Sequence, residues 1–202
     1  MAATLLAWVA VVLLAAASAG ILISRDWRWR LGLLAAQYLA AFWLVTQHWP
    51  VGMAAVKLVT GWMATAALGM TRLGISYAED AEESFWPQGR TFRLFGAAIM
   101  VVIAIAAGPR VESLNPGIGL PVIIGSLLLV GTGLLHLGIT SQTLRVVIGL
   151  LTVLCGFEII YAAVESSILV AALLALANLG LALTGSYLLI NSVPAETDEE
   201  TI

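Results

Sequence analysis

Residues 146–164 read VVIGLLTVLCGFEIIYAAV, an uninterrupted apolar run of 19 residues in which Glu158 is the sole charged side chain. An α-helix needs about 20 mostly apolar residues to cross the hydrocarbon core of a bilayer. The run lacks the alternation of apolar and polar residues that is typical of membrane β-strands. Because backbone groups in lipid must be hydrogen-bonded within the segment, this run predicts a transmembrane helix.

Six further stretches on either side of this run have similar length and composition, so we expect an all-α, polytopic bundle of about seven helices. Charged or proline-containing turns separate them: His48-Trp49-Pro50 precedes the third helix, Gly108-Pro109-Arg110 closes the fourth, and Asn115-Pro116-Gly117 opens the fifth. Thr140 or Ser141 is expected to cap the region before the sixth. The expected helices are residues 5–23, 31–47, 51–71, 92–107, 117–137, 146–164 and 167–190.

Composition excludes several classes of protein. Hydrophobic residues make up 61% of the chain and charged residues 10%, whereas a typical soluble domain is about a quarter charged. A soluble domain, a disordered chain and a nucleic-acid binder are therefore excluded, and Cys155 alone cannot build a disulfide scaffold. The sequence contains no Walker loop, dinucleotide fingerprint or nucleophile–base pair, and its two histidines are too far apart to be paired haem ligands. We expect no catalytic residue, no cofactor and no metal.

Arginine and lysine near the helix ends predict the orientation in the cell (inner) membrane. With the N-terminus outside, the outer loops hold only Arg110. The inner loops hold Arg25, Arg28, Arg30, Arg72, Arg90, Arg93 and Arg145. An outside N-terminus and a cytoplasmic C-terminus require an odd number of spans, which supports seven.

Residues 1–190 are expected to form a single transmembrane domain. Within it, residues 73–91 form an acidic cytoplasmic loop, and residues 191–202 are an acidic tail that we expect to be disordered. The first helix contains Ala17-Ser18-Ala19, a signal-peptide-like cleavage site, but residues 1–8 lack a basic region. We therefore favour an uncleaved membrane anchor.

Lys57 and Glu158 are the main candidate functional residues, because charged groups within membrane spans are costly. Lys57 lies about two turns into the third helix, where its long stem could also carry the ammonium group to the outer surface. Glu158 is interpreted as lying near the middle of its helix, where it needs a partner or water unless it stays protonated. We expect no partner of matched depth within the chain, so Glu158 is assigned to a proton path or an inter-subunit contact.

Glu165 and His136 are further candidates for polar or inter-subunit roles. Glu165 follows Glu158 by seven residues on the same helix face, but solvation at the outer end also explains it. His136 lies near the inner end of the fifth helix, where a lone histidine is more typical of an interfacial hydrogen bond than of a metal site. Gln37 and Asn178 are neutral polar residues that can bond across helices.

The last three expected helices resemble a known family. The segments SQTLRVVIGL (141–150) and ANLGLAL (177–183), together with Glu158, are similar to the three-helix subunit K (chain 4L) of NADH–quinone oxidoreductase and to the C subunit of multisubunit cation/proton antiporters. Over nearly its whole length, the chain resembles component E of hydrogenase-4 and formate-hydrogenlyase membrane arms. Gln37 and Lys57-Leu58-Val59 match polar positions in that component.

This resemblance implies a non-catalytic integral subunit, packed in the bilayer between antiporter-like subunits and contributing to a proton path. The buried glutamates of subunit K fall here on Leu151 and Leu176, which are apolar. Either Glu158 replaces them or the subunit is structural. Two alternatives remain: a stand-alone transporter or channel, which needs polar groups converging at the midplane, and a scaffold or assembly subunit of another complex.

Overall fold

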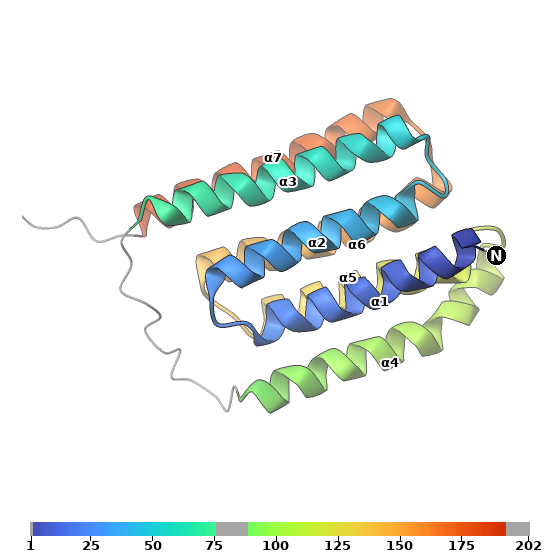
Figure 1. The fold of residues 1–202 in the computed structure, drawn as a ribbon, viewed down its shortest axis with the longest axis horizontal. Helices are drawn as coiled ribbons and strands as arrows, with labels where there is room; N and C mark the ends of the chain where they lie inside the picture. The colour runs from blue at the N-terminus through green and yellow to red at the C-terminus, as the bar shows by residue number, and fades with distance from the viewer. Residues whose placement is uncertain (1, 76–88, 193–202) are drawn as a thin grey trace, which may run out of the picture.

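The computed structural model describes residues 2–75 and 89–192, which form seven α-helices and no strand (Figure 1). The expected helices are all present, with bounds shifted by a few residues. The acidic part of the expected loop, with Glu79 to Glu83, and tail residues 193–202 lie outside the described residues. The helices are α1 (Ala2–Ile23), α2 (Trp27–Val45), α3 (Val51–Leu73), α4 (Arg90–Leu114), α5 (Leu120–Gly138), α6 (Thr143–Val164) and α7 (Ile168–Asn191).

Six of these helices are long and apolar enough to cross a membrane, so the chain is a multi-pass helical membrane protein. The helix outside this group is α2, which begins with Trp27-Arg28-Trp29-Arg30 and contains Gln37. Its lower hydropathy has a structural counterpart, because α2 packs against α1, α3, α5 and α6. Its polar residue Gln37 therefore lies on the packed side, while Trp29, Leu39 and Trp43 are exposed on the outer face.

Two layers of three helices build the bundle (Figure 1). Helices α1, α2 and α3 lie side by side in one layer, and α5, α6 and α7 lie behind them in the same order. Helix α4 flanks both layers at α1 and α5. Arg93 at the start of α4 donates to the carbonyl of Leu22 at the end of α1, so α4 runs antiparallel to α1. Each helix of the first layer is therefore parallel to its counterpart in the second.

The two ends of the bundle differ in charge. Turns 46–50, 115–119 and 165–167 lie at one end, which we call the Trp49 end. Turns 24–26 and 139–142 lie at the opposite end, together with all seven arginines that the sequence analysis groups in the inner loops. We call it the arginine end. Arg110 lies near the Trp49 end of α4. The expected segregation of charge is thus present in the fold.

Three expected helix boundaries are wrong. Helix α4 continues through Pro109 to Leu114 instead of closing there, since proline removes a single backbone donor while the helix is maintained on both sides. Helix α5 begins at Leu120, because Gly117 and Gly119 have positive φ angles of 111° and 87°, a conformation incompatible with a right-handed helix. Helix α6 begins at Thr143, and its N-cap residue Gln142 makes no side-chain capping bond.

Helix α2 also begins earlier than the expected residue 31, within the charged stretch from Arg25 to Arg30. Asp26 is its N-cap, and the Asp26 side chain accepts a hydrogen bond from the backbone N–H of Arg28. Arg30, which is buried, donates to the carbonyls of Ser24 and Arg25. These bonds satisfy backbone groups between α1 and α2, so the basic residues build the helix start as well as the turn.

Glycines allow the closest helix contacts of the second layer. A Cβ atom added at Gly156 of α6 would lie 2.9 Å from the carbonyl oxygen of Ser126 in α5. The Ser126 hydroxyl donates to the carbonyl of Gly156 at 2.7 Å, which locks the two backbones together. Gly185 of α7 likewise packs against Val147, whereas Gly180 faces open space. Close packing at a small residue is therefore present at Gly185 but not at Gly180.

Candidate functional site

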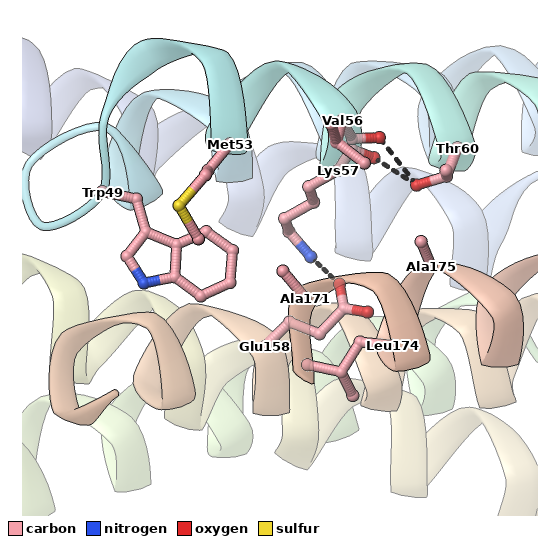
Figure 2. A pocket seen from close by; sticks show the side chains of 9 residues that line it. All are labelled: Trp49, Met53, Val56, Lys57, Thr60, Glu158, Ala171, Leu174 and Ala175. Atoms are coloured by element: carbon pink, nitrogen blue, oxygen red, sulfur yellow. Dashed lines mark hydrogen bonds and ion pairs between the residues drawn. The ribbon is translucent and has the colours of Figure 1, made fainter. Parts of the chain in front are cut away.

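Lys57 of α3 and Glu158 of α6 form a buried ion pair between the two layers of the bundle (Figure 2). The Lys57 ammonium donates to Oε2 of Glu158. The two residues are 6% and 4% exposed, so neither charge reaches the bilayer surface. The interpretation of Lys57 as a residue that snorkels to the surface is therefore wrong.

The two charges lie at the same depth, which corrects the expectation that they lack partners of matched depth. Lys57 is six residues from Val51, the first residue of α3, and Glu158 is six residues from Val164, the last residue of α6. At 1.5 Å per residue, both lie about 9 Å from the Trp49 end of their helices. Glu158 thus lies between the middle of α6 and this end, and its partner is inside the chain.

Asn178 and Tyr38 extend the ion pair to four helices. The Asn178 amide of α7 donates to Oε1 of Glu158 and to the carbonyl of Leu174. The Asn178 side-chain oxygen accepts a hydrogen bond of 2.8 Å from the hydroxyl of Tyr38 in α2. The Lys57 ammonium lies 5.7 Å from the centroid of the Tyr38 ring, within the range of a cation–π contact. We call Lys57, Glu158, Asn178 and Tyr38 the polar core.

A cavity of about 10 Å³ adjoins the polar core on the side of the Trp49 end. This space is enough for about one water molecule. Figure 2 shows that Trp49 and Met53 lie beside Lys57 in the direction of the α2–α3 turn. The Lys57–Glu158 pair is therefore enclosed by protein and still borders a water-sized space. The cavity lining comprises Trp49, Met53, Val56, Lys57, Thr60, Glu158, Ala171, Leu174 and Ala175.

A second polar cluster lies one layer of side chains further toward the arginine end. Gln37 of α2, which is fully buried, donates to the hydroxyl of Ser18 in α1 at 2.8 Å. The Thr152 hydroxyl of α6 lies 3.3 Å from the Gln37 side-chain oxygen and also bonds to the carbonyl of Ile148. The expected role of Gln37 and Asn178 in cross-helix hydrogen bonding is thus confirmed.

His136 of α5 is 5% exposed and lies two residues before the end of the helix, close to Arg30, Arg93 and Arg145. Neither ring nitrogen has hydrogen-bond geometry with a described residue. Gly149 of α6 makes room for the ring, since a Cβ atom there would lie 3.3 Å from Cδ2 of His136. The role of His136 as an interfacial hydrogen-bond partner therefore stays a prediction.

Glu165 does not belong to the polar core. It ends α6 as the C-cap residue, is exposed, and its carboxylate accepts a hydrogen bond from the backbone N–H of Ser166 at 3.1 Å. Its carbonyl accepts a hydrogen bond of 2.8 Å from the indole of Trp49. Glu165 therefore links the α2–α3 turn to the α6–α7 turn at the Trp49 end. Its exposure is in keeping with solvation at the end of the helix.

The two positions at which the resemblance to subunit K would place glutamates lie in different environments. Leu151 is fully buried in the apolar core, whereas Leu176 is 66% exposed on the outer face of α7. A carboxylate at residue 176 would face away from the bundle. That position therefore does not offer a second buried carboxylate to accompany Glu158. Among residues 2–75 and 89–192, no group of three His, Cys, Asp or Glu side chains gathers in a way that could hold a metal ion.

Comparison with protein-family models, curated proteins and solved structures gives no significant match for this chain. The polar core and the buried polar groups around it are therefore the features from which a function is inferred.

Proposed function

We propose that this chain is a non-catalytic integral subunit of a proton-translocating membrane complex of the hydrogenase-4 and NADH–quinone oxidoreductase type, and that the Lys57–Glu158 pair takes part in moving protons. The observation that carries the proposal is the buried pair itself, which is held by four helices and borders a water-sized space. The subunit would bind no cofactor, and its partners would be antiporter-like membrane subunits.

The energetics of the pair support a role beyond stability. Removing two charges from water costs several kcal/mol per ion, and a buried ion pair often stabilises a protein no better than apolar residues of similar volume. Ionisable residues within membrane spans are therefore most often retained for proton or ion pathways. A carboxylate beside an ammonium group has protonated and ionised forms that a small change in the position of the cation can interconvert.

The outer faces of the bundle fit a subunit that is packed among others. Helices α4 and α7 carry many exposed large apolar side chains, including Phe95, Val102, Leu169 and Leu183. These faces suit lipid tails and neighbouring transmembrane helices equally well. The three-helix layer α5–α7 corresponds in order to the segment that resembles subunit K.

The proposal includes a seventh span and an orientation. Helix α2 has 19 residues, as does α5, and a helix of this length rises about 28 Å, close to the thickness of the hydrocarbon core. It lies between α1 and α3, and its arginines are at the arginine end. We infer that α2 also crosses the membrane, with the arginine end on the cytoplasmic side.

A stand-alone proton channel or transporter is the second candidate. It is favoured by one specific observation: Lys57 and Glu158 neutralise each other within this chain, so neither charge requires a second subunit. This internal pairing removes one argument for a hetero-oligomer. The two candidates place the proton-carrying group at the same residues and differ in whether the isolated chain conducts.

The test uses the full-length chain in two preparations. Inverted membrane vesicles from cells that carry wild-type or Glu158→Gln protein are energised with NADH or formate, and proton uptake is followed with a pH-sensitive dye. The purified proteins are also placed in liposomes with an imposed potassium diffusion potential. Reduced uptake in Glu158→Gln vesicles, with passive wild-type liposomes, supports the subunit. Conduction by wild-type liposomes that Glu158→Gln abolishes supports the stand-alone protein.

A matched control is Glu165→Gln, the same chemical change at the exposed end of the same helix. It should leave proton uptake unchanged in both preparations. Normal uptake by properly inserted Glu158→Gln protein in vesicles and liposomes alike would contradict the proposed function.

A further inference from the structure

His136 separates two cavities inside the bundle. On one side, a cavity of about 10 Å³ is lined by five polar side chains: Ser18, Gln37, Thr132, His136 and Thr152. On the other side, His136 lines a second, narrower cavity with no room for a water molecule, together with Thr140, Arg30, Arg93 and Arg145. His136 is thus the polar residue that lines both cavities, which it shares with the apolar residues Ile21 and Leu22.

The first cavity has the properties of a water site. Its volume corresponds to about one water molecule, and a buried water needs two to four polar partners. Gln37, Ser18 and Thr152 already form a hydrogen-bonded cluster at its wall. The His136 nitrogens, which have no hydrogen-bond geometry with a described residue, provide the remaining donor and acceptor. A buried polar group left without a partner costs about 1–3 kcal/mol, so a water bound here stabilises the fold.

Helices α2 and α6 each carry polar side chains both at this cavity and at the polar core. Gln37 is adjacent in sequence to Tyr38, and Thr152 precedes Glu158 by six residues, a rise of about 9 Å along α6. Cys155 lies midway between Thr152 and Glu158 on this helix and is buried. Its thiol is a weak donor and acceptor. Polar side chains therefore follow one another from the Lys57–Glu158 pair to His136.

We propose that His136 and a water molecule bound beside Gln37 and Thr152 relay protons between the polar core and the arginine end. This inference rests on the proposed function of the Lys57–Glu158 pair. A neutral imidazole accepts a proton at one nitrogen and releases one from the other, so the ring returns to neutrality after each transfer. The Thr140 hydroxyl lines the second cavity and is the next group on the path.

The three arginines define the outer boundary of the relay. Arg30, Arg93 and Arg145 are the charged groups facing His136 among the described residues that line the two cavities. Guanidinium groups stay protonated in proteins and therefore do not carry the proton themselves. Their role in the relay is to keep this end polar, and the Thr140 hydroxyl that lies among them is the group that takes the proton onward.

A direct test of the water site uses the fact that the chain has two histidines. His48 bonds to the carbonyl of Ile118 at the Trp49 end, so His48→Gln leaves His136 as the single histidine without disturbing the relay. In lipid bilayers, nitrogen-15-labelled histidine in this protein should show magnetisation transfer from water to the His136 ring. A ring signal from folded protein without any contact to water would overturn the proposal.

The transport test compares three variants in whichever preparation carries the proton flux of wild-type protein. His136→Leu and His136→Gln should both lower the flux by roughly tenfold or more, because positioned proton-transfer groups contribute about 10²–10⁴-fold to rates. Glutamine retains hydrogen bonding, so it would rescue a residue whose role is only structural. His48→Gln is the matched control and should conduct normally.

The outcomes separate this inference from the proposed function. Flux that is lost in Glu158→Gln and normal in folded His136→Gln would overturn the relay and leave the function of the ion pair in place. Normal flux in Glu158→Gln would overturn the proposed function and the relay with it. Loss in Glu158→Gln and in both His136 variants, together with water contact at the ring, supports the relay.

Discussion

Tyr38 of α2 and Gly61 of α3 are in direct contact, and the Tyr38 ring occupies the space that a side chain at residue 61 would fill. The glycine thereby allows a fully buried aromatic ring to lie against the backbone of α3. This contact brings the Tyr38 hydroxyl to Asn178 and the ring close to Lys57. The geometry of the polar core therefore depends on the absence of a side chain at residue 61.

Gly61→Ala should displace Tyr38 and weaken the polar core. Inserting a methyl group into a packed core usually costs about 1–3 kcal/mol, and Tyr38 has no open space beside it. Unfolding of the purified protein in detergent, followed by intrinsic fluorescence, measures the loss. Gly180→Ala is the matched control, because nothing lies within 4 Å of a Cβ atom at Gly180. Equal stability of the two variants would contradict the assigned contact.

Tyr38→Phe should remove one hydrogen bond while preserving the packing of the ring. The Asn178 oxygen then loses its donor, at a cost of about 1 kcal/mol for an interhelical hydrogen bond in a membrane protein. Tyr187→Phe is the control, since Tyr187 lies on α7 and is exposed. Unfolding midpoints of the two variants should differ, and identical midpoints would show that the Tyr38 hydroxyl does not hold Asn178.

The ion pair predicts a non-additive result for substitutions at both of its residues. Removing one partner of a buried pair leaves an uncompensated charge and costs about 3–5 kcal/mol, whereas replacing both by apolar residues is often neutral or stabilising. Lys57→Met and Glu158→Met should each destabilise the protein, and the double variant should regain most of the stability. A double variant as unstable as the sum of the two single variants would argue against direct pairing.

The helices could be predicted from the sequence because a membrane span is a local property of length and hydropathy. The pairing of Lys57 with Glu158 could not, because it depends on which helices are neighbours across 101 residues of chain. Their equal depth was nevertheless present in the expected bounds, since residues 51 and 164 are each six residues away. Counting from the helix ends would have identified the pair as candidates for contact.

Tyr38 and Gly61 illustrate what sequence patterns leave out. An aromatic residue and a glycine in apolar helices are common, and neither carries a signal that the two touch. The sequence places His136 two residues before the end of its helix, but it does not show that neighbouring helices enclose the side chain. How helices pack around a residue near a helix end decides whether it is buried. The amino-acid sequence of one chain does not directly show this packing.

The membrane topology is the last testable consequence of the fold. Because Cys155 is the only cysteine and is buried, a Cys155→Ala background permits labelling at single introduced cysteines. Ser24→Cys and Gln47→Cys flank α2, so a membrane-impermeant thiol reagent should reach them from opposite sides if α2 crosses the bilayer. Labels at residues 2 and 200 should then report an outside N-terminus and a cytoplasmic C-terminus, as the seven arginines of the arginine end predict. Labelling of residues 24 and 47 from the same side would show that α2 does not cross the bilayer and that the chain has six spans. It would contradict the orientation proposed for helices α3 to α7 relative to α1.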